Sequence, residues 1–180
     1  MGILMENTFK PHRRIEQSGE LKLSERINTL KVVFKRLESF DVTTSRGRIA
    51  IQKIIYFLQA FGINLGYSFS WFIHGPYSTG LMADAFALDK MCDTVQERQL
   101  ADEEEQALEK LSVFLGDRID DYVWLELLGS IHFLRAIAPL LKKDEIIRQI
   151  LVHQEYFTEE MCDEAWNYLV KFDSRGDRFQ

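Results

Sequence analysis

The stretch RIAIQKIIYFLQAF, Arg48–Phe61, constrains the fold most, because it would be apolar on nearly every side of a helix. A helix of this kind has no solvent-facing side, so other elements must surround it. Gln52, Tyr56 and Gln59 recur at i, i+4 and i+7, which places them in one narrow polar stripe on that helix. Gly62 fits the end of the helix. The chain is therefore predicted to fold around one central, buried helix.

Helical spacing of apolar residues predicts further amphipathic helices on both sides of the central one. Residues with a side-chain oxygen mark where these helices begin, because that oxygen can accept an unpaired backbone N–H. The expected starts are Ser24, Ser78, Asp102 with Glu105 in a capping box, about Ile119, Asp144 and Thr158. The sequence thus predicts a compact bundle of about six or seven helices around a central apolar helix.

Two short segments have the composition and alternation of strands. The segment YSFSWFI, Tyr67–Ile73, alternates aromatic residues with serine in its first half, and Gly75-Pro76 is expected to end it. The segment TVQERQL, Thr94–Leu100, also alternates, and we expect it to pair with the first across the intervening helix. The predicted fold class is mainly α, that is α+β with a minor two-stranded β element.

Length and composition indicate one domain. The chain has 180 residues, with 46% hydrophobic and 28% charged residues, which is near ordinary globular usage. Only 3 prolines and 10 glycines occur, which argues against long linkers. Residues 1–22 show no periodicity and are interpreted as an N-terminal arm, residues 23–175 as a single helical domain, and residues 176–180 as a C-terminal tail.

The cysteine content and the lack of long apolar runs favour a cytoplasmic protein. Cys92 and Cys162 have no C-x-x-C spacing, and two thiols in a chain of this length form no disulfide framework, so reduced, buried thiols are expected. The first residues contain too short an apolar run for a signal peptide, and no later run reaches the roughly eighteen apolar residues of a membrane span. No membrane interaction is predicted.

No motif in the sequence calls for catalysis, and the chain is predicted not to be an enzyme. The loop HGPYSTG, His74–Gly80, resembles a phosphate-binding turn, but it lacks the lysine that a P-loop needs. The four histidines form no helical pair that could bind one metal ion, so neither a metal nor another cofactor is expected. His132, in an apolar helix, is interpreted as a hydrogen-bonded core residue. His74 alone has a position that favours a role in binding.

An uneven charge distribution raises a nucleic-acid alternative. Residues 1–60 carry 11 Lys/Arg and 6 Asp/Glu, a net +5, whereas residues 61–180 carry 11 and 22, a net −11. A DNA-binding, winged-helix-like regulator could use this basic third, although a solvated basic face that complements the acidic remainder is favoured. The residues that would contact DNA in this alternative are Arg26, Lys31, Lys35, Arg36, Arg46 and Arg48.

Two blocks carry a family resemblance: IQKIIYFLQ, Ile51–Gln59, and WFIHGPYS, Trp71–Ser78. With them the chain resembles the SocA-like, or Panacea, domain, and most closely its YwgA-like relatives. These share an "LQK-apolar-apolar-Tyr" helix followed by an aromatic strand and Gly-Pro-Tyr-Ser. The resemblance covers about Arg48–Asp93. The chain departs from the family pattern at Ile51, where leucine is usual, and at His74, where tyrosine is common.

The resemblance implies a small α-rich domain of bacterial or phage type that acts as an antitoxin or as an adaptor holding a partner protein, such as a toxin or a protease substrate. A buried glutamine on the central helix needs hydrogen-bond partners, and the Gly-Pro turn offers backbone groups. We expect Gln52 or Tyr56 to brace that turn, which either only marks the fold or also contacts a partner protein. The candidate protein-binding residues are Gln52, Lys53, Tyr56, Trp71, His74, Gly75, Pro76 and Tyr77.

Overall fold

The computed structural model describes residues 23–39, 41–91, 94–95 and 97–174 of the chain. The predicted N-terminal arm, the C-terminal tail and Cys92 lie outside the described residues. Of the described residues, 70% are helical, and they form seven α-helices and one small antiparallel sheet. The predicted class, mainly α with a minor two-stranded element, is confirmed.

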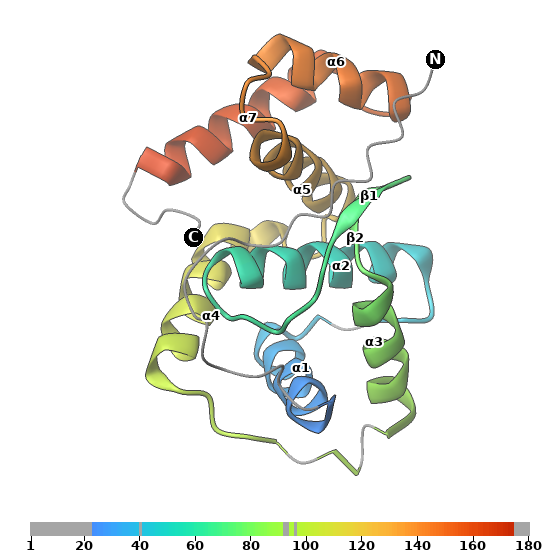
Figure 1. The fold of residues 1–180 in the computed structure, drawn as a ribbon, viewed down its shortest axis with the longest axis vertical. Helices are drawn as coiled ribbons and strands as arrows, with labels where there is room; N and C mark the ends of the chain where they lie inside the picture. The colour runs from blue at the N-terminus through green and yellow to red at the C-terminus, as the bar shows by residue number, and fades with distance from the viewer. Residues whose placement is uncertain (1–22, 40, 92–93, 96, 175–180) are drawn as a thin grey trace.

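Figure 1 shows the elements in chain order. The helix α2 crosses the middle of the molecule, with α1 and α3 on one side and α5, α6 and α7 on the other. The elements are α1 (Leu23–Leu37), α2 (Ser45–Ala60), β1 (Ser70–Phe72), β2 (Gly75–Tyr77), α3 (Thr79–Met91), α4 (Asp102–Leu115), the 3-10 helix η1 (Gly116–Arg118), α5 (Tyr122–Ile137), α6 (Lys143–His153) and α7 (Glu159–Ser174).

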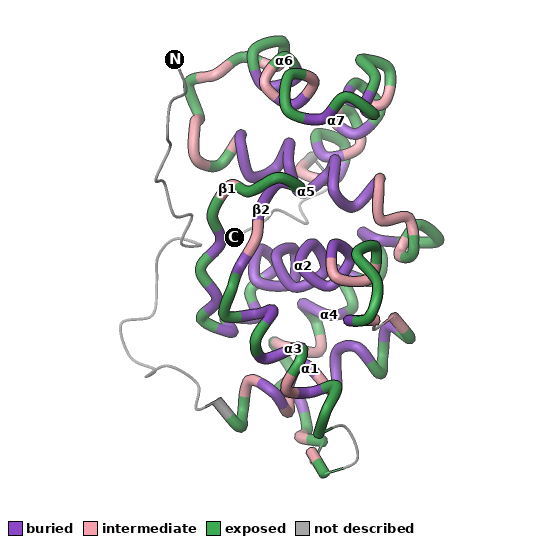
Figure 2. The backbone as a smooth tube through the Cα atoms, turned by 90° about the vertical axis from the view of Figure 1, so that its right-hand side faces the viewer, coloured by how far each residue is buried: buried purple, intermediate pink, exposed green. Residues whose placement is uncertain are grey.

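The predicted central helix is α2, and every residue of it from Ile49 to Ala60 is buried. It packs against α3, α4, α5 and the hairpin, and Figure 2 shows it buried along most of its length. Its polar start is fixed by Thr44, whose side chain accepts from the backbone N–H of Gly47 at 3.1 Å. Aromatic rings fill the space below its C-terminal end, where Phe57 and Phe61 both contact Phe114. The central helix therefore packs inside one continuous core, with other elements on several sides.

The two-stranded sheet differs from the predicted one. Ser70–Phe72 pairs with Gly75–Tyr77 in a tight hairpin, so Gly75-Pro76 begins the second strand instead of ending the first. A local partner costs less chain entropy than one beyond a helix, and Gly75, at φ +76°, permits the close turn. The described residues of Thr94–Leu100 form no strand; the carbonyl of Val95 accepts from Lys31 Nζ at 2.7 Å.

Two helix starts agree with the sequence prediction. The Ser78 hydroxyl accepts from the backbone N–H of Leu81 at 3.3 Å, where α3 begins. The Thr158 hydroxyl accepts from Met161 at the same distance, at the start of α7. In both cases a hydroxyl directly before an apolar helical pattern correctly indicated where the helix begins.

The other predicted starts are displaced by one to three residues. The helix α4 has Ala101 as its N-cap, and the N3 residue Glu104 accepts from the Ala101 N–H at 2.8 Å, one position earlier than the predicted Asp102–Glu105 box. Runs of neighbouring acids offer several equivalent caps, so sequence alone does not select one. Three more starts were misplaced: α1 begins before Ser24, α5 begins at Tyr122 after a cap by Asp121, and α6 begins at Lys143 with Glu145 as its N3 acceptor.

Two further expectations concern the state of Cys162 and the absence of a membrane span. Cys162 is a buried free thiol, as predicted, and burial raises its pKa to about 11. Among the described helices, none combines the length and the apolar character needed to cross a membrane.

Candidate functional site

Two glutamines of α2 hold the two ends of the hairpin segment. Gln52 donates from Nε2 to the Ser78 carbonyl at 2.9 Å and accepts from the Ser78 N–H at 2.8 Å. Gln59 does the same to Tyr67, with both bonds at 2.9 Å. Each side-chain amide thus bonds both the N–H and the carbonyl of one residue, as a neighbouring strand would, and both pairs of bonds are buried. Because the two glutamines are two turns apart, α2 fixes where the hairpin begins and ends.

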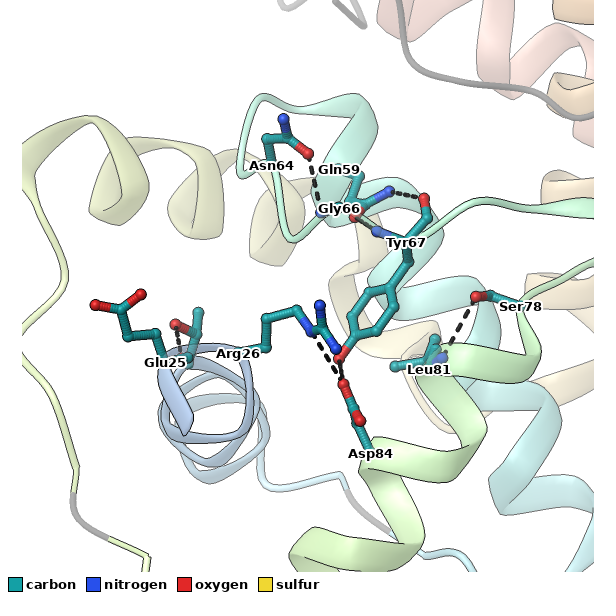
Figure 3. A network of polar contacts seen from close by, with 10 residues as sticks. Glu25, Arg26, Gln59, Asn64, Gly66, Tyr67, Ser78, Leu81 and Asp84 are labelled. Carbon is teal, nitrogen blue, oxygen red and sulfur yellow. Dashed lines mark hydrogen bonds and ion pairs between the residues drawn. The ribbon is translucent and has the colours of Figure 1, made fainter. Parts of the chain in front are cut away.

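Figure 3 shows the Gln59–Tyr67 contact together with the polar network beside it. The Tyr67 hydroxyl donates to Asp84 Oδ2 at 2.8 Å, and Arg26 Nε donates to the same oxygen at 3.1 Å. Asp84 is only 7% exposed, so it has both a charged and a neutral partner in a poorly solvated position. This network connects α1, the chain before β1, and α3.

Lys53 fixes the middle of the hairpin. Its Nζ donates to the Pro76 carbonyl at 2.7 Å, and the residue is 1% exposed. Its stem crosses α5 at Gly129, where a Cβ would lie 2.9 Å from Lys53 Cδ. Burial lowers the pKa of Lys53 to about 7, and the negative charge of Glu126 opposes that shift. A buried ammonium with a neutral carbonyl partner is an unusual way to hold a strand.

Tyr56 faces α5 instead of the turn. Its hydroxyl lies 2.7 Å from Nδ1 of His132, and both side chains are buried. Burial lowers the pKa of His132 to about 3, so the imidazole is neutral near pH 7. His132 is therefore the hydrogen-bonded core residue that the sequence indicated. Of the two residues expected to brace the turn, Gln52 contacts the backbone directly after it and Tyr56 does not.

The tip of the hairpin exposes apolar side chains. Phe72 is 55% exposed and Ile73 is 64% exposed, and Figure 2 shows β1 at the surface beside buried α5. Trp71, one residue earlier, packs on the core, with its ring 6.2 Å from that of Phe133 between centroids. Tyr77 on β2 stacks with Phe72 at 5.4 Å. The two strands thus have an inner aromatic face and an outward-pointing tip.

Three side chains outside the hairpin fix its tip. His74 Nδ1 lies 3.1 Å from Glu126 Oε1 on α5, and the Tyr156 hydroxyl donates to the same oxygen. Gln154, at the end of α6, donates to the carbonyl of Ile73. Glu126 is fully buried, so these contacts are poorly screened by water. The tip is exposed but held in place from two further helices.

Gly75 lies where no other residue fits. Its φ is +76°, and a Cβ there would come within 2.2 Å of Ser130 Oγ on α5. Within the described part of the chain, Ser130 Oγ and Glu126 Oε2 are buried atoms with no hydrogen-bond partner. The close approach of the hairpin to α5 thus depends on a glycine.

The residues named for a nucleic-acid interface contact the protein's own groups. The exposed cations of α1 face acids from residues 61–180, with Lys35 Nζ 2.8 Å from Glu97 and Arg36 3.0 Å from Glu105. The other four are also engaged: Arg26 with Asp84, Lys31 with the Val95 carbonyl, Arg46 over the Tyr122 ring, and Arg48 with the carbonyls of Val42 and Thr43 and the hydroxyl of Ser45. The basic and acidic parts of the sequence therefore complement each other within the fold.

The residues that the structure describes contain no group of three or more His, Cys, Asp or Glu side chains that could hold a metal ion. The carboxylates of Glu126 and Asp84 each accept from a tyrosine hydroxyl, Glu126 from Tyr156 and Asp84 from Tyr67.

Sequence reasoning found the α2 side of this site and missed the α5 side. Glu126 and Ser130 lie one turn apart in the apolar stretch WLELLGSIHFL, Trp124–Leu134, and Tyr156 lies far along the chain. A glutamate inside an apolar helix was the available signal, because a buried carboxylate requires partners. Comparison with known proteins gives no further guide: no protein-family model, curated protein or solved structure matches the chain.

Proposed function

We propose that the protein is a non-catalytic, cytoplasmic protein-binding module that holds its partner against the tip of the β1–β2 hairpin. The observation that carries this proposal is an exposed apolar tip, Phe72 and Ile73, on a hairpin fixed to α2 and α5. Rigid aromatic and aliphatic side chains lose little entropy on binding, so they make effective anchors.

The type of partner follows from the resemblance to the SocA-like domain. The two blocks of that resemblance, Ile51–Gln59 and Trp71–Ser78, are joined by the bonds from Gln52 and Lys53 to the hairpin backbone. An antitoxin-like or proteolytic-adaptor-like role of bacterial or phage type is the proposal that unites the motif with the exposed tip. The partner would be a toxin or a protease substrate.

Binding to DNA is the weaker alternative. A nucleic-acid footprint needs cations that are available for phosphates, whereas Lys35 and Arg36 already face Glu97 and Glu105. The alternative predicts steep salt dependence of binding to duplex DNA, and titration at low salt would test it directly.

A photocrosslinking amino acid at position 72 tests the proposed surface. The chain would be produced in its native cell, and crosslinked proteins would be identified by mass spectrometry. The matched control places the same amino acid at position 113, because Val113 on α4 is 64% exposed and lies outside the hairpin. We expect one partner to be captured from position 72 and not from position 113.

A pair of double variants tests the same surface without a crosslinker. Phe72→Ser with Ile73→Ser should release the captured partner, whereas Val113→Ser with Val170→Ser should retain it. Both pairs remove exposed apolar side chains, so both should leave the helical circular dichroism unchanged. Full retention of the partner by the folded tip variant would refute the proposed surface.

A further inference from the structure

A hollow of about 300 Å³ lies between the first half of α2, the hairpin and α3. Its walls are largely apolar and come from Ile49, Phe72, Ile73, Tyr77 and Met82. This volume lies at the lower end of the roughly 300–1,000 Å³ that small-molecule pockets occupy. The hollow is thus large enough for a short apolar molecule and too small for an extended cofactor.

The polar residues of the hollow have an excess of hydrogen-bond donors. Arg48 and Lys53 line it, and no Asp or Glu is among its lining residues. In the described chain, the buried Lys53 ammonium has one hydrogen-bond acceptor, the Pro76 carbonyl, although an ammonium has three N–H groups. The Arg48 guanidinium uses three of its five N–H groups on Val42, Thr43 and Ser45. Donors therefore remain on the α2 side of the hollow.

We propose that this hollow binds a small monocarboxylic acid with an apolar body, whose carboxylate accepts from Lys53. The apolar body would lie along Ile49, Met82 and the hairpin rings, and Arg48 would add positive charge at the entrance. A single buried ammonium, supported by one partly used guanidinium, matches a monoanion. The hollow shares Phe72 and Ile73 with the proposed protein-binding tip, but binding of a small acid needs no partner and can be tested on the purified chain alone.

The surroundings of Lys53 favour such a ligand. The negative charge of Glu126 offsets part of the cost of burying the Lys53 ammonium, and a bound anion would supply further charge and hydrogen bonds. Burial lowers the pKa of Lys53 to about 7, and a bound carboxylate would raise it again. The charged or titratable groups around it are Glu126 on α5, His74 and Tyr77 on the hairpin, Arg48 on α2, and Tyr156 after α6. Affinity should therefore fall as the pH rises above neutrality.

Three probes with one chain length and different head groups test the proposal. Isothermal titration of the purified full-length protein would compare octanoate, octan-1-ol and octylamine at pH 6.5. We expect octanoate to bind at least about tenfold more tightly than the alcohol, and the amine to bind most weakly. Equal binding of acid and alcohol, or no binding of octanoate at millimolar concentration, would overturn the proposal.

A peptide probe distinguishes a small free acid from the C-terminal carboxylate of a polypeptide as the ligand. An acetylated tripeptide ending in leucine carries the same carboxylate beside an apolar side chain, and its C-terminal amide is the control. Weaker binding of this peptide than of octanoate supports a small-molecule site. Tighter binding of the peptide acid than of octanoate would overturn the assignment to a free acid.

Two variants with the same substitution locate the site. Ile73→Glu places a carboxylate at the mouth of the hollow, and Val113→Glu places one on α4 at a residue of equal exposure, 64%. The affinity for octanoate should fall about tenfold in Ile73→Glu and stay unchanged in Val113→Glu. Unchanged binding by Ile73→Glu would overturn the proposal. Lys53→Met, where it folds, should abolish the preference for octanoate over octan-1-ol.

Discussion

Lys35 and Lys53 form hydrogen bonds of nearly equal length in very different surroundings. Lys35 Nζ lies 2.8 Å from Glu97, and its side chain is 65% exposed. Lys53 Nζ lies 2.7 Å from a neutral carbonyl, and the residue is 1% exposed. Water competes for the first bond and screens its charges, whereas the low exposure of Lys53 weakens both effects on the second bond. Burial, more than the formal charge of the partner, decides which contact matters.

The same contrast separates two regions of the molecule. Between α1 and the segments that face it, several charged pairs lie at the surface, including Arg36–Glu105. Between α2, the hairpin and α5, polar groups are paired inside the core, as in the Gln52 and Gln59 contacts. Removing a partner from the second region leaves a buried group unsatisfied, which does not happen at exposed pairs of the first region such as Arg36–Glu105. Mutations in the two regions should therefore differ sharply in cost.

Gln52→Leu should produce the largest loss of stability. The leucine would leave the Ser78 N–H without its partner and the Ser78 carbonyl with the Met82 N–H as its remaining donor, and Ser78 is 2% exposed. We expect the free energy of unfolding to fall by about 2 to 4 kcal/mol, because two buried backbone groups lose hydrogen bonds. Urea denaturation would measure this loss. Amide signals of the hairpin should shift as well, and an unchanged midpoint with unchanged hairpin signals would contradict the role assigned to Gln52.

The pH dependence of stability should reveal Lys53. Its pKa is lowered from 10.5 to about 7 in the folded chain, so between pH 7 and pH 9 the unfolded chain holds the extra proton. Stability should therefore rise with pH in this window, by at most about 1.4 kcal/mol per pH unit, whereas Lys53 should add nothing to the slope of stability with pH well below pH 7, where both states are protonated. Above pH 9 the raised pKa of Cys162 acts in the opposite direction.

Lys53→Met provides the control for that slope. The variant keeps the length of the stem that packs on Gly129 but has no titratable group. Urea midpoints of the two proteins at pH 7, 8 and 9 should show a steeper rise for the wild type. Parallel curves would assign the slope to other groups and would show that Lys53 stays protonated in the fold.

Tyr56→Phe should have an intermediate effect. The phenylalanine fits the same space but removes the hydrogen bond between the Tyr56 hydroxyl and Nδ1 of the buried His132. We expect a loss of about 1 to 2 kcal/mol in the free energy of unfolding, measured in urea at pH 7.5. Tyr77→Phe is the matched control, because Tyr77 is only half-buried. Equal losses in the two variants would show that burial does not set the cost at Tyr56.

Much of the buried region could be predicted from the sequence, but its partners could not. The apolar pattern of α2 and the spacing of Gln52, Tyr56 and Gln59 are local, so periodicity revealed them. Their acceptors lie on other elements, and the position of Glu126 opposite His74 depends on how α5 packs. The sequence prediction paired the first strand with the wrong segment, because alternation in residues 94–100 does not exclude a loop. Short alternating segments specify strands weakly without tertiary context.

The surface pair Arg36–Glu105 should contribute least. Two N–H groups of Arg36 face the two carboxylate oxygens at 3.3 and 3.0 Å, but the side chains are 57% and 40% exposed. A double-mutant cycle with Arg36→Gln and Glu105→Gln isolates the pair from the solvation of each residue. The coupling should be at most about 0.5 kcal/mol at 0.15 M salt.

The salt dependence of the coupling energy provides an independent test of the Arg36–Glu105 pair. An exposed pair is screened, so its coupling should vanish in 1 M sodium chloride, where the Debye length is about 3 Å. The loss caused by Gln52→Leu should stay the same in that salt, because it involves uncharged, buried groups. A coupling of Arg36 with Glu105 that survived high salt would mean that geometry can outweigh exposure. The contrast between the two regions would then rest on how rigidly each pair is held, in addition to how deeply it is buried.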